Sequence, residues 1–147
     1  MKIFNYSLLV FILALLVSFV TTTLAQNMGG NVVVVNNAEL ALSGEGSMSA
    51  FDSLTIEYNK WCMDKNDVII SYKVVRHWWG HNNRDFVTIV EVASWEDVLA
   101  FNQKANELFE AHWDTPEKRK AFNDAYNKYF TGQHSDEIYQ EVVFESN

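Results

Sequence analysis

The chain has 147 residues, with 19 Asp or Glu against 11 Lys or Arg, which gives a formal charge of -8 at pH 7. Proteins that bind nucleic acid place clustered Lys and Arg against phosphates, so this balance argues against nucleic acid as a partner. The length suits one domain with one core, and the single cysteine, Cys62, excludes an intramolecular disulfide. Because Cys62 lies in an apolar helical pattern, we expect it to be a buried, unreactive thiol.

The first 25 residues have the pattern of a signal peptide. Lys2 supplies the positive charge, residues 8–20 are almost wholly apolar, and the Thr-Leu-Ala sequence at 23–25 matches a cleavage site. A membrane anchor is the alternative, but the apolar run is shorter than the ~20 residues of a spanning helix. We expect cleavage, no stable membrane span afterwards, and an exported protein that is periplasmic or secreted.

A flexible leader at residues 26–30 is expected to precede a single folded domain at residues 31–147. Its first element is a strand, predicted from the β-branched run at 32–35 and the extended pattern at 38–42. The Asn residues at 36–37 disfavour regular pairing, so we expect the strand to break there.

A helix follows a loop rich in Gly and Ser. It is predicted to begin near Ser49, which has capping-box spacing to Asp52. One apolar stripe recurs at helical spacing, formed by Phe51, Leu54, Tyr58, Trp61 and Cys62.

The next two elements are predicted to form a β-hairpin, with strands at 68–79 and 85–92 and a turn at 80–83. Alternate residues of a strand point to opposite faces. In the first strand the more apolar set should meet the helices: Val68, Ile70, Tyr72, Val74, Arg76 and Trp78. The other set should face a cavity, a partner subunit or water: Ile69, Ser71, Lys73, Val75, His77 and Trp79.

The second hairpin strand is also apolar on both faces, with Phe86, Thr88, Val90 and Val92 on one face and Val87, Ile89 and Glu91 on the other. A sheet that is apolar on both faces must be covered on both. One layer of helices covers one face only. The sequence therefore predicts a homodimer in which two sheets close on each other.

Three further elements complete the domain. A helix begins at Ser94, and another has Thr115 as its cap and Pro116 at its first position. Gly132 is predicted to be the left-handed cap that ends this helix, and the last strand is expected at residues 138–144.

The element order β-α-β-β-α-α-β predicts an α+β, ferredoxin-like βαββαβ sandwich with an extra helix before the last strand. With SWEDVLAFNQKA at 94–105 and GQHSDEIY at 132–139, the chain resembles the dimeric α/β-barrel superfamily over most of residues 31–145. That superfamily includes antibiotic-biosynthesis-monooxygenase-like and EthD-like domains. The resemblance implies a ligand between sheet and helices or within the barrel. Haem-degrading relatives use Asn, Trp and His, so haem stays an open alternative, although no motif implies a cofactor.

Four histidines lie at predicted element ends and loops, where binding residues collect. His77 ends a strand, His81 lies in the hairpin turn, and His112 is near a helix end. His134 is expected in the loop that enters the last strand, close to Asp136. The spacing matches no metal motif, which leaves a polar ligand pocket or separate surface histidines as alternatives. The ligand-binding candidates are Lys73, His77, Trp79, His81, His112, His134 and Asp136.

No phosphate loop, nucleophile elbow or HExxH motif occurs, which argues against nucleotide-dependent enzymes, α/β serine hydrolases and zinc proteases. The first hypothesis is an exported protein that binds a small hydrophobic or aromatic molecule in an aromatic and histidine-lined pocket. The alternatives are a cofactor-independent oxygenase or isomerase on the same scaffold, and a non-catalytic structural or interaction module. For Trp78 and Trp79, packing in the core or at a dimer interface is favoured over ligand stacking.

Overall fold

The computed structural model describes residues 29–41, 46–81 and 83–143, and residues 31–141 form one unit. The predicted signal peptide lies outside the described residues. The elements are β1 (Val32–Leu40), α2 (Met48–Tyr58), the π-helical segment η1 (Asn59–Met63), β2 (Ile69–Arg76), β3 (Asp85–Val92), α3 (Asp97–His112), α4 (Pro116–Asn127) and β4 (Phe130–Gln140). This order confirms the predicted α+β, ferredoxin-like βαββαβ arrangement with an extra helix before the last strand.

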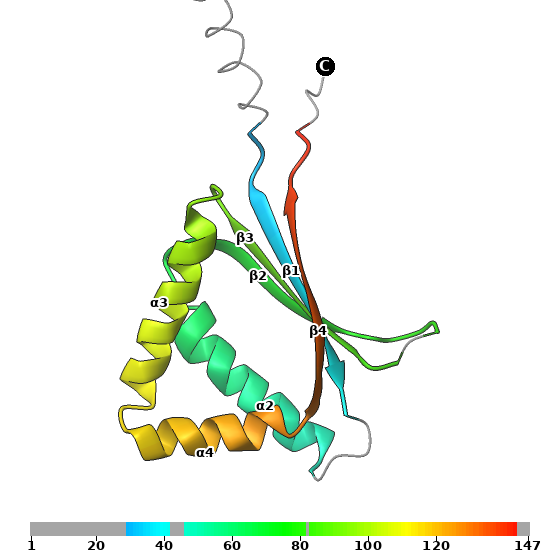
Figure 1. The fold of residues 1–147 in the computed structure, drawn as a ribbon, viewed down its shortest axis with the longest axis vertical. Coiled ribbons are helices and arrows are strands. Elements are labelled where there is room, and N and C mark those ends of the chain that lie inside the picture. The colour runs from blue at the N-terminus through cyan, green and yellow to red at the C-terminus, as the bar shows by residue number, and fades with distance from the viewer. Residues whose placement is uncertain (1–28, 42–45, 82, 144–147) are drawn as a thin grey trace, which may run out of the picture. The chain divides into compact units, whose positions relative to one another are not determined.

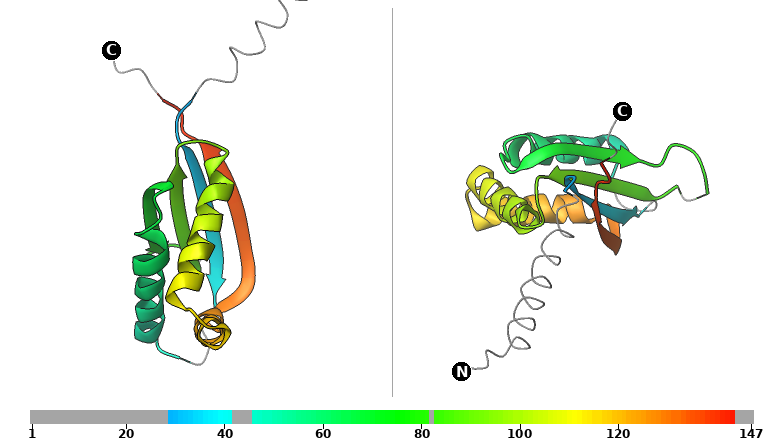
Figure 2. Two further views of the ribbon diagram at one scale, coloured as in Figure 1. Left: turned by 90° about the vertical axis from the view of Figure 1, so that its left-hand side faces the viewer. Right: turned by 90° about the horizontal axis from the view of Figure 1, so that it is seen from above.

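The four strands form one antiparallel sheet in the order β2-β3-β1-β4 (Figure 1). The predicted hairpin supplies β2 and β3, and β3 lies between β1 and β2, so the β1-α2-β2 connection is split by a third strand. The helices α2 and α3 run across one face of the sheet, and α4 lies across their ends (Figures 1 and 2). The opposite face has no covering layer within the described part of this unit.

The core lies between the sheet and the helices in two clusters. The larger one joins Val90 and Val92 of β3 to Phe101 of α3, Phe122 of α4 and Cys62 of η1. Cys62 is fully buried, as predicted, and burial raises the pKa of its thiol to about 11.

The smaller cluster is centred on Phe51, which is completely buried. Its ring centroid lies 5.0–5.6 Å from those of four other aromatic rings: Phe86, Tyr126, Tyr129 and Phe130. The first residues of α2 are therefore anchored to β3 and to the junction of α4 with β4.

The predicted break at residues 36–37 is wrong, because β1 is continuous and both Asn residues pair with β3 and β4. The Asn36 amide donates to Asp136 Oδ1 at 2.6 Å, so its polar group is satisfied across the strands instead of disrupting them.

The expected faces of β2 are correct for Val68 and from Ser71 to Arg76, and wrong for Ile69 and Ile70. The pairing register shifts between Ile69 and Ser71, so Ile69 packs on the core while Ile70 is 53% exposed. A β-bulge of this kind inserts one residue and reverses the alternation on one side of it. Arg76 faces the helices, as predicted, and pairs with Asp52 of α2 at 2.7 Å.

The last strand begins at Phe130, eight residues before the predicted start, and residue 144 lies outside the described residues. Gly132 has a φ of +86°, but it lies inside β4, and α4 already ends at Asn127. The prediction missed this segment because β4 is an edge strand whose residues after Phe130 are exposed, so polar side chains are tolerated on both faces.

The helix α2 begins at Met48, near Ser49 as predicted, but its cap is Ser47, whose hydroxyl accepts from the Ala50 amide at 3.2 Å. The helix α3 begins at Asp97, three residues after the predicted start at Ser94. Thr115 caps α4 and Pro116 is its first residue, both as predicted.

Candidate ligand-binding cavity

A cavity of about 490 Å³ lies between the sheet and the helices. This volume is within the range of small-molecule sites, which are clefts with mostly apolar walls and a few polar groups. Its lining comes from all four strands and from η1 and the three helices: Val34, Asn36, Tyr58, Met63, Tyr72, Thr88, Val90, Val98, Phe101, Asn102, Ala105, Tyr126, Asp136 and Ile138. The cavity lies at one of the two places where the resemblance to dimeric α/β barrels implies a ligand, the other being within the barrel.

Three tyrosines give the apolar wall its hydroxyl groups. Tyr58 comes from the end of α2, Tyr72 from the helix-facing side of β2, and Tyr126 from the inner face of α4. Burial raises the pKa of Tyr58 to about 12 and raises the pKa values of Tyr72 and Tyr126 in the same direction. All three phenols are therefore neutral near pH 7.

The π-helical turn after α2 orients one of these phenols. The Asp64 amide donates to the Asn59 carbonyl at 2.8 Å, five residues back, where a regular helix would use residue 60. The Asn59 side chain then accepts from the Tyr72 hydroxyl at 3.0 Å. The same turn carries Met63 into the cavity lining, which agrees with the frequent occurrence of π-turns at functional sites.

The Tyr58 hydroxyl differs from that of Tyr72, because no described side chain or backbone group bonds it. Among the described residues, no side-chain oxygen is both fully buried and without a hydrogen-bond partner, so the Tyr58 hydroxyl is not fully buried. The hydroxyl is thus open to solvent or to a ligand in the cavity.

One carboxylate lies at the edge of the cavity, on β4. Asp136 Oδ1 accepts from the Asn36 amide at 2.6 Å, and Asp136 Oδ2 lies 3.4 Å from Nε2 of His134. The two β4 residues share the helix-facing side, because Asn36 and Ala38 are their partners on β1. The structure thus brings together two of the residues proposed from sequence, His134 and Asp136. His134 lies within β4 rather than in a preceding loop.

The hairpin residues proposed from sequence lie apart from the cavity lining. The hairpin projects past the other strands as a two-stranded arm (Figure 1), and the His77 amide donates to the Asp85 carbonyl at its base. Trp78 and Trp79 are 97% and 90% exposed. The prediction that Trp78 meets the helices is therefore wrong, because the arm extends beyond them. His81 is also exposed on the arm.

Lys73 and His112 occupy two other places. Lys73 points to the uncovered face of the sheet, where its charge helps lower the pKa of Glu91. His112, at the end of α3, stacks on Trp61 with ring centroids 4.2 Å apart, and its Nε2 lies 3.3 Å from Glu57 Oε1. Through these contacts His112 packs the end of α3 against α2 and η1.

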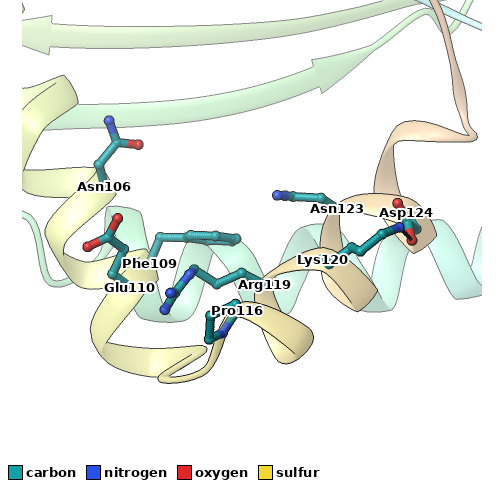
Figure 3. A pocket seen from close by; sticks show the side chains of 8 residues that line it. All are labelled: Asn106, Phe109, Glu110, Pro116, Arg119, Lys120, Asn123 and Asp124. Atoms are coloured by element: carbon teal, nitrogen blue, oxygen red, sulfur yellow. Dashed lines mark hydrogen bonds and ion pairs between the residues drawn. The ribbon is translucent and has the colours of Figure 1, made fainter.

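A more open hollow of about 730 Å³ lies between α3 and α4 (Figure 3). Its four charged groups are balanced, with Glu110 and Asp124 against Arg119 and Lys120. Lys120 pairs with Asp124 at 2.5 Å, and Arg119 donates to the Trp113 carbonyl at 2.9 Å. Both cations of this surface thus have partners within the chain.

A third hollow, of about 520 Å³, adjoins the cavity at Asn36 and is lined by His134 and the start of β4. Across residues 29–41, 46–81 and 83–143, no group of three or more His, Cys, Asp or Glu is placed to hold a metal ion. In the same ranges, no helix has the length and apolar character to cross a membrane.

The cavity tyrosines were not among the residues proposed from sequence. Their signal was present, since Tyr58 and Tyr126 belong to helical stripes and Tyr72 to the apolar face of a strand. Tyrosine on a buried face brings a hydroxyl that needs a partner, and this property distinguishes it from Phe as a pocket residue.

No protein-family model matches this sequence, and no curated protein matches it. Solved structures do match. A nipsnap family protein of unknown function from Agrobacterium tumefaciens has a TM-score of 0.55 at 11% identity, over 80% of this chain and 93% of that chain. A candidate antibiotic biosynthesis monooxygenase from Caulobacter crescentus has a TM-score of 0.52 at 12% identity, over 79% of this chain and 93% of that chain.

A second candidate antibiotic biosynthesis monooxygenase, from Nitrosomonas europaea, has a TM-score of 0.51 at 12% identity, over 78% of this chain and 92% of that chain. Identities this low establish a shared fold and leave activity open. The matches confirm the ferredoxin-like fold that the resemblance implied. The chain has the ferredoxin-like fold of the antibiotic-biosynthesis-monooxygenase-like and nipsnap proteins.

Proposed function

We propose that this protein binds a small hydrophobic or aromatic molecule in the cavity between its sheet and its helices. The observation that carries the proposal is the lining itself, which combines apolar side chains with neutral phenols and a carboxamide-carboxylate pair, Asn36 and Asp136. Such a wall contributes contact area through its rings and fixes orientation through a few polar atoms.

The protein acts as a homodimer in this proposal, with two uncovered sheet faces packed together. Val33 and Val35 of β1 and Val87 and Ile89 of β3 lie on that face, opposite the helix-facing residues with which they alternate. A contiguous apolar surface of this kind on a monomer marks an interaction site. A second copy supplies an equally apolar face, as an isologous interface requires.

The proposed location is outside the cytoplasm, periplasmic or secreted, after cleavage behind Ala25. This part of the proposal rests on the charge and apolar pattern of the first 25 residues. The negative charge of the remaining chain is compatible with solubility after export.

Native mass spectrometry of the protein recovered after export tests these points together. The subunit mass reports whether residues 1–25 have been removed, and the assembly mass reports whether two chains associate. An additional mass that leaves on activation identifies a retained ligand. A monomer that neither retains nor takes up aromatic compounds would contradict the proposal.

A second candidate function is an enzyme on the same scaffold, a cofactor-independent oxygenase or isomerase. The observation that favours it is the series His134, Asp136 and Asn36 at the edge of the cavity. A histidine beside a carboxylate is a common arrangement for removing a proton from a substrate. His134→Ala separates the two functions, because an enzyme would lose turnover and keep most of its affinity, whereas a binding protein would lose affinity. In a purely structural module the same change would alter neither, and Trp79→Ala would instead break the dimer.

A further inference from the structure

We propose that the cavity selects an organic cation, with its apolar or aromatic body among the tyrosines and its ammonium group on the Asp136 carboxylate. This inference rests on the proposed binding function and adds the chemical class of the ligand.

The first argument is the charge of the lining. Asp136 is the one ionisable group with a charge at neutral pH among the described residues that line the cavity, and no Lys, Arg or His is among them. A ligand carboxylate or phosphate needs a basic partner when it leaves water. An anionic ligand would find here a carboxylate of its own sign.

The second argument concerns the cations near the site. Arg76, at the end of β2, is paired with Asp52, and Lys104 of α3 lies 3.8 Å from Asp67. His134 is the basic group beside Asp136, and it is not part of the cavity lining. The side chains of His134 and Asp136 are 56% and 61% exposed, so the carboxylate lies where the cavity opens to solvent. The carboxylate still has capacity for an incoming donor, because each of its two oxygens can accept two hydrogen bonds and has one partner, Asn36 at Oδ1 and His134 at Oδ2.

The third argument is the aromatic content of the walls. Tyr58, Tyr72, Tyr126 and Phe101 all line the cavity. Neutral aromatic rings attract cations through their quadrupole, and several rings around one carboxylate are a known solution for binding ammonium groups. The rings would also contact an uncharged aromatic body, so the charge preference is decided by Asp136.

Three probes with one naphthalene ring test the selection by isothermal titration calorimetry at neutral pH. They differ only in the substituent, which is an aminomethyl, a hydroxymethyl or a carboxylate group. We expect the amine to bind at least about tenfold more tightly than the carboxylate, with the alcohol between them. In Asp136→Asn the amine should fall to the affinity of the alcohol.

Glu137→Gln is the matched control, because it removes the same charge from the next residue of β4 on the opposite face of the sheet. This control measures how much of the change in amine affinity comes from the lower negative charge of the whole chain. If Asp136→Asn does not fold, Ile138→Lys tests the same idea by adding a positive charge to the cavity lining, two residues along the same face. The amine should then lose its advantage and the carboxylate should gain affinity.

Equal affinities for the amine and the carboxylate, or equal effects of Asp136→Asn and Glu137→Gln, would overturn cation selection and leave the binding function standing. Failure of all three probes to bind would overturn the binding function as well.

Discussion

The two faces of the sheet are made by the same four strands, yet they are built for different neighbours. On the helix-facing side Val90 and Val92 are 5% and 0% exposed and belong to the core, and Val90 also lines the cavity. On the other side Val33 and Ile89 are just as apolar but have no covering layer among the described elements. The alternation of side chains along each strand thus gives the sheet one face that the helices cover and one face that we propose a second subunit covers.

The largest effect should come from placing a charge on each face in turn, at adjacent residues of β3. Val90→Asp puts a carboxylate into the core without a partner, which should cost about 3–5 kcal/mol and unfold much of the protein. Ile89→Asp should leave the subunit folded and separate the dimer. Circular dichroism and analytical ultracentrifugation of the two variants measure these outcomes. A folded dimer in Ile89→Asp would mean that this face is not the interface.

A comparably large loss is expected from Phe51→Ala on the helix-facing side. The change empties the centre of a five-ring cluster, and removing a buried Phe costs about 3–5 kcal/mol. Ile56→Ala on the same helix is the control, because Ile56 is 66% exposed and should change stability by less than about 0.5 kcal/mol. Urea unfolding of both variants gives the difference, and similar values would contradict the packing.

Sequence could predict the parts of the fold whose signals are local. Both hairpin strands and the cap at Thr115 followed from apolar periodicity and turn chemistry, which act over a few residues. The bulge at Ile69 and the bond between Asn36 and Asp136 could not be predicted, because each depends on a strand far away in the chain. The early start of β4 was missed for a related reason, since an exposed edge strand carries no apolar pattern.

The candidate site was harder to predict than the fold. Sequence drew attention to polar residues at the hairpin, and the structure places His77 and Trp79 on a projecting arm. The cavity instead uses tyrosines that a sequence pattern cannot distinguish from ordinary core residues. Asp136 was the one proposed residue that lines it.

A smaller effect, confined to alkaline pH, should come from the cavity phenols. The pKa of Tyr58 is raised from 10.0 to about 12 because burial disfavours the phenolate. Its contribution to stability is complete below pH 10 and is lost as the pH rises towards about 12. Tyr58→Phe should therefore unfold at a higher pH than the parent protein, as followed by circular dichroism.

Tyr139→Phe is the control for this titration in the dissociated subunit, because Tyr139 lies on the uncovered face and is 54% exposed in the single chain. Its alkaline transition should match that of the parent protein. If Tyr58→Phe unfolded at the same alkaline pH as the parent protein, burial of this phenol would not govern alkaline unfolding.

The smallest effect should come from Glu91, a polar residue of the uncovered face. Its carboxylate accepts from the Ser71 hydroxyl at 2.6 Å and from the Asn31 amide at 2.5 Å, and these bonds hold its pKa below the usual range. A lowered pKa in the folded chain contributes stability that is present above the unfolded pKa and lost as the pH falls through the folded one. Glu91→Gln should therefore be less stable than the parent at neutral pH, and the difference should shrink in acid. Urea unfolding from neutral to acid pH measures this difference in stability. Glu137→Gln, on the same face, is the control, and its difference from the parent should not shrink in acid. A constant difference between Glu91→Gln and the parent would mean that the lost stability comes from packing and not from the charged form of the carboxylate.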